Sequence, residues 1–139
     1  MPLVLDASIV ACWFFGDEQD PRAEAAWERL EEDRAIVPLQ WWFEVRNVCL
    51  LGERRGRATE AQTDEFLREL PSFAIDFDSL PDQRSVVALS RRYRLTLYDA
   101  AYLELAQRQA IPLATLDKEL VTAARGEGVP LVLAAMIKR

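Results

Sequence analysis

Three aspartates of this sequence each follow a short apolar run, as an acid at the end of a buried strand would. They are Asp6, Asp99 and Asp117. In an open parallel sheet, ligands bind outside the carboxyl ends of the strands, so acids at such positions are expected to meet at one edge. Each acid alone also fits a simpler role, because aspartate caps helix N-termini well. Asp20 and Asp82 are expected to be caps and nothing more.

A fourth acid, Glu44, lies within an apolar stripe of the longest predicted helix, which spans residues 39–55. At helical spacing the stripe contains Trp41, Glu44, Val45, Val48 and Leu51. A buried carboxylate without a partner is costly, so it must be protonated, paired or bound to a cation. Arg46 points to another side of this helix, whereas Asn47 borders the same face as Glu44. Glu44 is therefore a candidate functional residue.

Carboxylates that converge at one edge repel each other and take up protons unless a cation joins them. Mg²⁺ and Mn²⁺ prefer carboxylate oxygen and water, and they keep open positions for phosphate oxygens. Such a site supports phosphodiester hydrolysis, in which the ion binds the phosphate, activates the attacking water and stabilises the leaving oxygen.

The sequence contains no histidine, which excludes the usual Ser-His-Asp, Cys-His and imidazole acid–base mechanisms. A zinc site is disfavoured as well, because Cys12 and Cys49 alone cannot complete one. Both cysteines lie in apolar surroundings and are expected to be core thiols. Any chemistry must therefore rest on carboxylates, hydroxyls, arginines or a hard metal ion.

Short apolar runs alternate with helical patterns along the chain. The predicted strands are 3–5, 35–37, 73–76, 113–115 and 131–133, and the predicted helices are 7–15, one from Pro21, 39–55, 59–70, 81–93, 97–109 and 117–125. This order predicts an α/β fold with a short parallel sheet of four to five strands, covered by helices on both faces. The 139 residues are expected to form one domain, 1–139.

The net charge of −6 is concentrated in residues 17–33, which hold eight acids and two bases. Elsewhere the chain carries two arginine groups: Arg46, Arg54, Arg55 and Arg57, and Arg84, Arg91, Arg92 and Arg94. Arginine forks onto phosphate oxygens, so an acidic total does not exclude nucleic acid. Solvated helix faces explain the same arginines equally well.

No apolar run approaches the roughly 18 residues that span a bilayer. Asp6 interrupts the apolar start of the chain, which is unlike a signal peptide. These two features predict a soluble, cytoplasmic protein.

Four motifs of this chain resemble the PIN-domain family, especially the VapC-type toxins of bacterial toxin–antitoxin pairs. They are Val4–Ser8 (VLDAS), Glu44–Asn47 (EVRN), Tyr98–Tyr102 (YDAAY) and Leu113–Asp117 (LATLD). Any one motif is weak evidence, but the four occur in the order and spacing of the family and cover essentially the whole chain. The third motif is the most specific.

The resemblance implies a magnesium- or manganese-dependent endoribonuclease on a single PIN-like domain. Its catalytic residues would be Asp6, Glu44, Asp99 and Asp117, with the three aspartates as metal ligands and Glu44 holding or activating the water. Ser8 and Thr115 would orient the carboxylates and Asn47 would support Glu44. Local backbone hydrogen bonds explain Ser8 and Thr115 equally well.

The resemblance also implies an RNA substrate, a homodimer, and a cognate antitoxin that wraps the toxin and blocks the site. Adjacent aromatic residues give mild support for a protein partner, because neighbouring side chains on a helix diverge and cannot all face the core. These residues are Trp13, Phe14, Phe15, Trp41 and Trp42. Those that remain exposed would form a groove for a partner helix.

Other α/β proteins with acidic pockets fit less well. A phosphoryl-accepting receiver domain needs paired acids near the first strand, and a haloacid-dehalogenase-type phosphatase needs Asp-x-Asp, whereas Asp6 stands alone there. No glycine-rich loop followed by Lys-Ser or Lys-Thr is present, so a Walker-type nucleotide site is excluded. The alternative that stays open is a non-catalytic RNA- or protein-binding module on the same fold.

Overall fold

Four parallel strands form the centre of the structure, which is a computed structural model that describes residues 1–17 and 19–133. They are β1 (Leu3–Leu5), β2 (Arg34–Val37), β3 (Ala74–Phe77) and β4 (Leu113–Ala114). Their order in the sheet is β3-β2-β1-β4. The expected α/β fold with four to five parallel strands is confirmed. Glu18 of the acidic segment and the last six positions of the predicted domain, 134–139, lie outside the described residues.

The predicted strand 131–133 is reduced to one parallel bridge, between Leu113 and Leu131. Leu113 donates to the Pro130 carbonyl at 2.9 Å and accepts from the Val132 amide at 2.9 Å. Within residues 1–17 and 19–133, which the structure describes, this pairing extends no further, because β4 itself ends at Ala114.

Seven α-helices connect and follow the strands in the described part of the chain. They are α1 (Ala7–Phe15), α2 (Pro21–Leu30), α3 (Trp41–Arg54), α4 (Glu60–Glu69), α5 (Gln83–Tyr93), α6 (Leu97–Gln109) and α7 (Lys118–Gly126), with a 3₁₀ turn at Leu70–Ser72 between α4 and β3. Asp20 and Asp82 cap α2 and α5 as predicted, and Thr59 at the start of α4 forms a capping box with Gln62. None of these described helices is long and apolar enough to cross a membrane.

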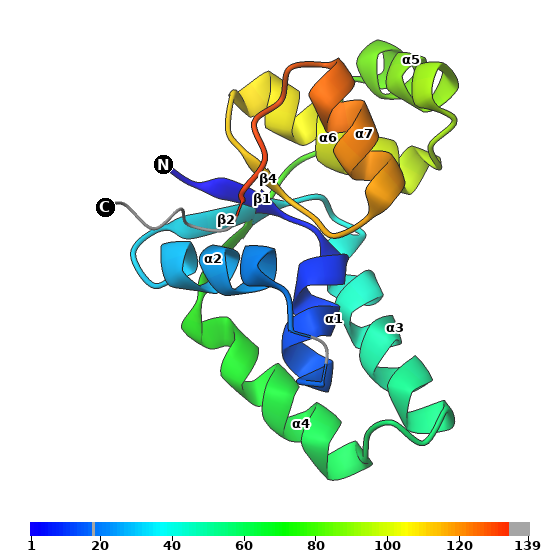
Figure 1. Cartoon of the computed structure of the whole chain (residues 1–139). Helices are drawn as coiled ribbons and strands as arrows, with labels where there is room; N and C mark the ends of the chain where they lie inside the picture. Colours follow the sequence, from blue (N-terminus) through cyan, green and yellow to red (C-terminus); the bar gives the residue numbers. More distant parts are fainter. Residues whose placement is uncertain (18, 134–139) are drawn as a thin grey trace.

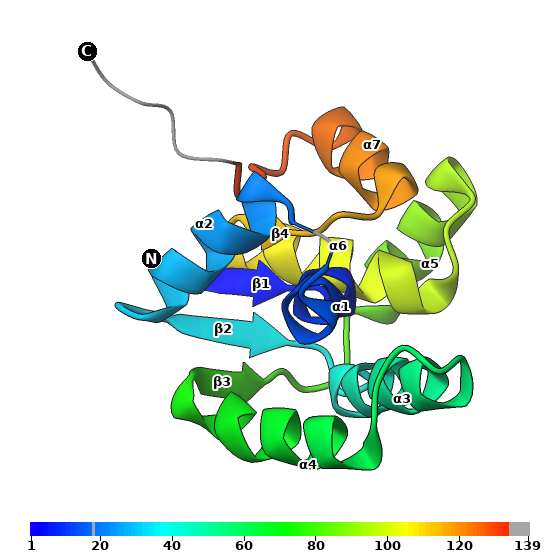
Figure 2. The same ribbon diagram turned by 60° about the horizontal axis from the view of Figure 1, so that its bottom comes forward.

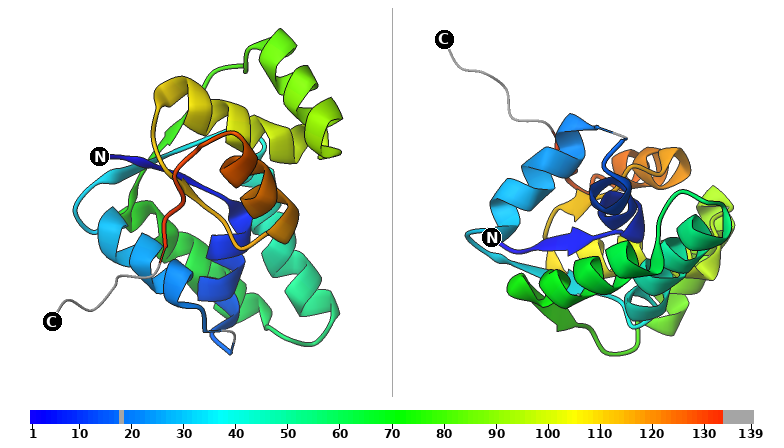
Figure 3. Two further views of the ribbon diagram at one scale, coloured as in Figure 1. Left: turned by 45° about the horizontal axis from the view of Figure 1, so that its top comes forward. Right: turned by 90° about the horizontal axis from the view of Figure 1, so that it is seen from below.

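The helices divide between the two faces of the sheet. The connections from β1 to β2 and from β2 to β3 run in one direction, whereas the connection from β3 to β4 runs back past them. Right-handed crossovers therefore place α1 to α4 on one face and α5 to α7 on the other. Figure 1 shows α1 to α4 below the strands and α5 to α7 above them, and Figure 3 shows the same division from two further sides.

The central strand β1 is completely apolar and is buried at all three positions. A parallel strand covered on both faces has this composition, since neither side of its pleat meets water. In Figure 2 the parallel strands point the same way, and α1 begins directly where β1 ends. The direction of the connections reverses between β1 and β4, so the crevice outside these two carboxyl ends is where a ligand would bind.

Candidate active site

Asp6 lies directly after β1, at the N-terminus of α1, and only 6% of its surface is exposed. Two hydroxyl groups donate to the same oxygen, Oδ2: Ser8 Oγ at 2.6 Å and Thr115 Oγ1 at 2.6 Å. The Ser8 oxygen also accepts from the Leu116 amide at 2.9 Å, and the Thr115 oxygen accepts from the Asp117 amide at 3.1 Å. The two hydroxyls therefore hold the carboxylate and the backbone after β4 together. The Thr115 bond to the Asp117 amide is local, whereas the Ser8 bond to the Leu116 amide joins residues 108 positions apart.

Burial raises the pKa of Asp6 above its usual value. The hydrogen bonds from Ser8, Thr115 and the Ala7 amide lower this pKa, whereas the nearby charge of Asp117 raises it further. The pKa of Asp6 is raised overall, so the fold holds this carboxylate where its negative charge is unfavourable unless a cation is near.

Asp117 is the N-cap of α7 and accepts from the Leu120 amide at 3.0 Å. Asp99 occupies a different kind of position from the one expected. No strand precedes it, because Leu95 belongs to the connection after α5, and Thr96 is the cap that begins α6. Asp99 therefore lies in the first turn of a helix, where its own amide donates to Thr96 Oγ1 at 3.1 Å.

The pKa of Asp99 is raised by burial first, and then by the negative charges of Asp117, Asp6 and Glu119. The hydrogen bond from Thr96 lowers the same pKa and offsets only part of the increase. Asp99 is therefore an electrostatic neighbour of both other aspartates, although it reaches them from α6 and not from the end of a strand.

Glu44 lies at the border of the buried face of α3, not in its centre. The buried stripe runs through Trp41, Val45, Cys49 and Gly52, so the stripe expected from the sequence is rotated and Glu44 is half-buried. One of its oxygens, Oε1, accepts a hydrogen bond from the Tyr102 hydroxyl at 2.5 Å. Burial raises the pKa of Glu44, Tyr102 lowers it, and the charges of Asp6 and Asp99 raise it.

The four acids form one electrostatic group at the carboxyl ends of β1 and β4: Asp117 raises the pKa of Asp6 and Asp99, and Asp6 and Asp99 raise that of Glu44. As the side chains stand, no three histidine, cysteine or acidic residues among those that the structure describes are arranged to hold a metal ion. The donor set nevertheless fits Mg²⁺ or Mn²⁺, since it consists of carboxylate oxygens and these ions retain several waters that bridge to protein ligands.

Two other residues from the sequence analysis lie apart from this group. Asn47 is exposed, and its side chain makes no hydrogen bond to Glu44 within the described residues. Arg46 donates to the Trp42 carbonyl at 3.0 Å and covers the Trp42 ring at 4.0 Å, so it does point away from Glu44 as expected.

Sequence reasoning missed Tyr102 as a member of the site. The residue lies three positions after Asp99 on α6, and side chains at this spacing share one face of a helix. The spacing in Tyr98–Tyr102 could have indicated it, but the contact with Glu44 joins two helices 58 residues apart in sequence.

The structure combines a doubly wound parallel sheet with a group of acidic residues at its switch point, where the direction of the strand connections reverses. This combination places the chain among the α/β proteins that bind a ligand at that edge of the sheet. The model of the PIN-domain family matches residues 3–126 of this chain. The chain therefore belongs to the PIN-domain family.

One relative within this family is Ribonuclease VapC3 of Pyrobaculum aerophilum. It is 32% identical over 123 residues, which cover 86% of this chain and 92% of that protein. The crystal structure of PAE2754 from Pyrobaculum aerophilum is similar with a TM-score of 0.68 and 24% identity, over 91% of this chain and 81% of that one. Mycobacterium tuberculosis VapC20, described as a sarcin–ricin loop cleaving toxin, has a TM-score of 0.56 and 16% identity, over 87% and 94% of the two chains.

The raised pKa of Asp99 predicts a specific dependence of stability on pH. The folded chain binds the Asp99 proton more tightly than the unfolded chain does. The stability that Asp99 contributes is therefore complete below the ordinary aspartate pKa of about 4 and is lost as the pH rises through the raised value. We expect Asp99→Asn to raise the free energy of unfolding at pH 7 in EDTA, with the difference shrinking toward pH 4, in urea titrations.

Asp82→Asn is the matched control for this measurement. The hydrogen bonds from Ser85 lower the pKa of Asp82, so its charge is favourable in the fold and its removal should bring no gain at pH 7. An Asp99→Asn variant that is less stable than the wild type at pH 7 would contradict the electrostatic description of the site.

Proposed function

We propose that this chain is a magnesium- or manganese-dependent endoribonuclease that hydrolyses RNA phosphodiester bonds. The observation that carries the proposal is the convergence of Asp6, Glu44, Asp99 and Asp117 at the switch point of a PIN-domain sheet. The similarity to Ribonuclease VapC3 supports the choice of RNA as substrate. The absence of histidine from the sequence agrees with a mechanism based on carboxylates.

In this proposal Asp6, Asp99 and Asp117 would hold the metal ion, directly or through water. A bound divalent ion would supply Lewis acidity toward the phosphate and lower the pKa of the attacking water. Ser8 and Thr115 keep the Asp6 carboxylate in place through their bonds to Oδ2. The raised pKa of Glu44, caused mainly by burial, suits a general base that takes the proton of that water.

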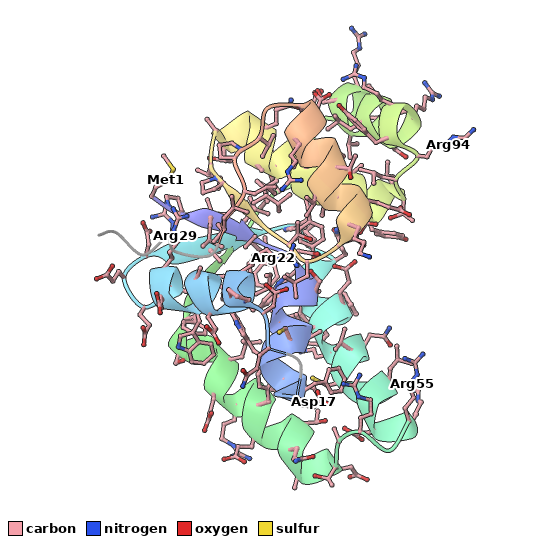
Figure 4. All side chains as sticks on the ribbon, viewed as in Figure 1. Met1, Asp17, Arg22, Arg29, Arg55 and Arg94 are labelled. Atoms are coloured by element: carbon pink, nitrogen blue, oxygen red, sulfur yellow. The ribbon has the colours of Figure 1, made fainter. Side chains whose placement is uncertain are left out.

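Exposed arginines supply the positive charge that an RNA backbone requires. Figure 4 shows Arg55 at the end of α3 and Arg94 at the end of α5, both projecting outward on the same side of the molecule. Arg57 and Arg92, one from each arginine group, form ion pairs with Asp17 and Glu127 and reach phosphate less freely than their neighbours. Contacts of this type bind without reading sequence.

The first test is cleavage of a mixed RNA substrate by the purified protein. We expect cleavage with Mg²⁺ or Mn²⁺, none in EDTA, and a loss of about a hundredfold or more in Asp6→Ala and Asp99→Asn, since metal stabilisation of the transition state is worth several kcal/mol. Asp20→Asn is the control, because Asp20 is also an aspartate at a helix N-terminus, but it pairs with Arg22 and its pKa is not shifted by any of the four acids.

Cleavage that persists in EDTA would contradict the proposed mechanism. RNA binding without any cleavage would favour the alternative function, a non-catalytic binding module on the same fold.

We further propose that the chain is the toxin of a toxin–antitoxin pair, acts in the cytoplasm, forms a homodimer and is inhibited by a cognate antitoxin. Exposed apolar surface supports a protein partner. Trp41 of the expected aromatic groove is buried, but Trp42 is 46% exposed. Trp42 borders a cavity of about 300 Å³ lined by Trp41, Trp42, Arg46, Leu70, Phe73, Ile75 and Phe77.

Trp13 contributes little to such a groove, whereas Phe14 and Phe15 are half-buried and line a separate pocket of about 210 Å³. Trp13 packs against Trp27 and Phe73, and Phe14 packs against Phe66. The indole nitrogen of Trp13 also donates to the Ala23 carbonyl at 2.9 Å, so this side chain is engaged within the fold.

Expression of the chain in bacteria tests the toxin role. We expect growth arrest from the wild type, relief by co-expression of the neighbouring gene, and no arrest from Asp6→Ala. Sequencing the 5′ ends of the RNA fragments would identify the target. Normal growth together with an unchanged RNA profile would contradict the toxin assignment.

A further inference from the structure

The hydroxyl of Tyr102 connects the buried core to the acidic group. The Tyr102 side chain comes from α6 and is fully buried, with 0% of its surface exposed. A buried hydroxyl needs a hydrogen-bond partner, and here it donates to Oε1 of Glu44 on α3. The bond therefore joins α3 to α6, which carry two of the four acids of the site.

The Tyr102 hydroxyl is surrounded by residues of the candidate active site. Burial, followed by the charges of Asp6 and Glu44, raises the pKa of Tyr102 far above its usual value, so the group stays protonated and remains a donor. The backbone amide of Ala7, the first residue after Asp6, acts on the pKa of both Tyr102 and Asp6. Tyr102 thus lies between Glu44 and the start of α1.

A hydrogen bond to an ionised carboxylate is short, strong and directional. The Glu44 side chain is half-buried, flexible in principle and repelled by the charges of Asp6 and Asp99. Without a donor on this side, repulsion would turn its carboxylate away from the other acids. The Tyr102 hydroxyl opposes that movement and binds one of the two carboxylate oxygens.

We infer that Tyr102 is a positioning residue for the proposed nuclease reaction: its hydroxyl fixes the Glu44 carboxylate toward Asp6 and Asp99, with Oε1 occupied and Oε2 left for the attacking water. This role rests on the proposed function, because it assigns to Glu44 the water-binding task. In the proposed reaction, Tyr102 itself contacts neither the substrate nor the metal ion.

A second tyrosine–glutamate hydrogen bond lies away from the site and provides a control for the one between Tyr102 and Glu44. Tyr93 donates to Glu127 Oε2 at 2.6 Å, and this carboxylate also binds Arg92 and Gln107. The bond resembles that of Tyr102 in chemistry and length, but it joins α5 to the end of α7. Tyr93→Phe therefore removes an equivalent hydroxyl without altering the acidic group.

The kinetic test compares Tyr102→Phe with Tyr93→Phe in metal-dependent RNA cleavage. We expect Tyr102→Phe to lower kcat by about tenfold to a hundredfold, the effect of losing a hydrogen bond to a charged group, with KM nearly unchanged. Tyr93→Phe should leave both parameters unchanged. In a Glu44→Gln background, Tyr102→Phe should add no further loss, because Tyr102 acts only through Glu44.

A second readout does not depend on activity. Crystal structures of the wild type and of Tyr102→Phe should show the Glu44 carboxylate in one orientation in the former and turned away or in several orientations in the latter. If Glu44 moves as expected but the wild type cleaves no RNA, the proposed function fails and the positioning contact stands.

Three results would overturn the inference. The first is an unchanged Glu44 position in Tyr102→Phe, and the second is an unchanged kcat. The third is a Tyr102→Phe chain that no longer folds, which would assign the hydroxyl to stability, since phenylalanine keeps the buried ring.

Discussion

The central constraint in this molecule is that a nearly buried carboxylate, Asp6, is held among other carboxylates. Its burial and the charge of Asp117 both raise its pKa, and only two hydroxyls and one amide oppose this. Ser8 and Thr115 supply the hydroxyls, so the start of α1 and the end of β4 must lie together. A protein selected for stability alone would place an apolar residue here, and the divalent cation of the proposed function would offset this cost.

The fold satisfies this constraint through the order of its strands. Because β1 and β4 are neighbours and parallel, their carboxyl ends open on the same side. Asp6 follows β1 directly, and Asp117 follows β4 after Thr115 and Leu116. The helices on the two faces then bring one acid each: α3 carries Glu44 and α6 carries Asp99. Acids that are distant in sequence thereby raise the pKa of Asp6, Asp99 and Glu44. The hydrogen bond from Tyr102 on α6 to Glu44 on α3 joins the two helices.

The sequence predicted those features that depend on local patterns. Asp6 follows an apolar strand, and the caps at Asp20, Thr59 and Asp82 follow from local composition. Asp99 was expected at the end of a strand but lies in the first turn of α6, because a short apolar run does not distinguish a strand from the start of a helix. The Tyr102–Glu44 contact depends on how two helices pack, which no local pattern encodes.

Anomalous scattering from a crystal grown with Mn²⁺ would show directly whether the four acids share a cation. We expect one or more peaks among them, with oxygens of Asp6 and Asp99 bound directly or through a coordinated water. Direct bonds would have lengths of about 2.1 Å, as expected for a small divalent ion. A protein that cleaves RNA in Mn²⁺ while its bound manganese lies elsewhere would contradict the claim that these carboxylates share a catalytic cation.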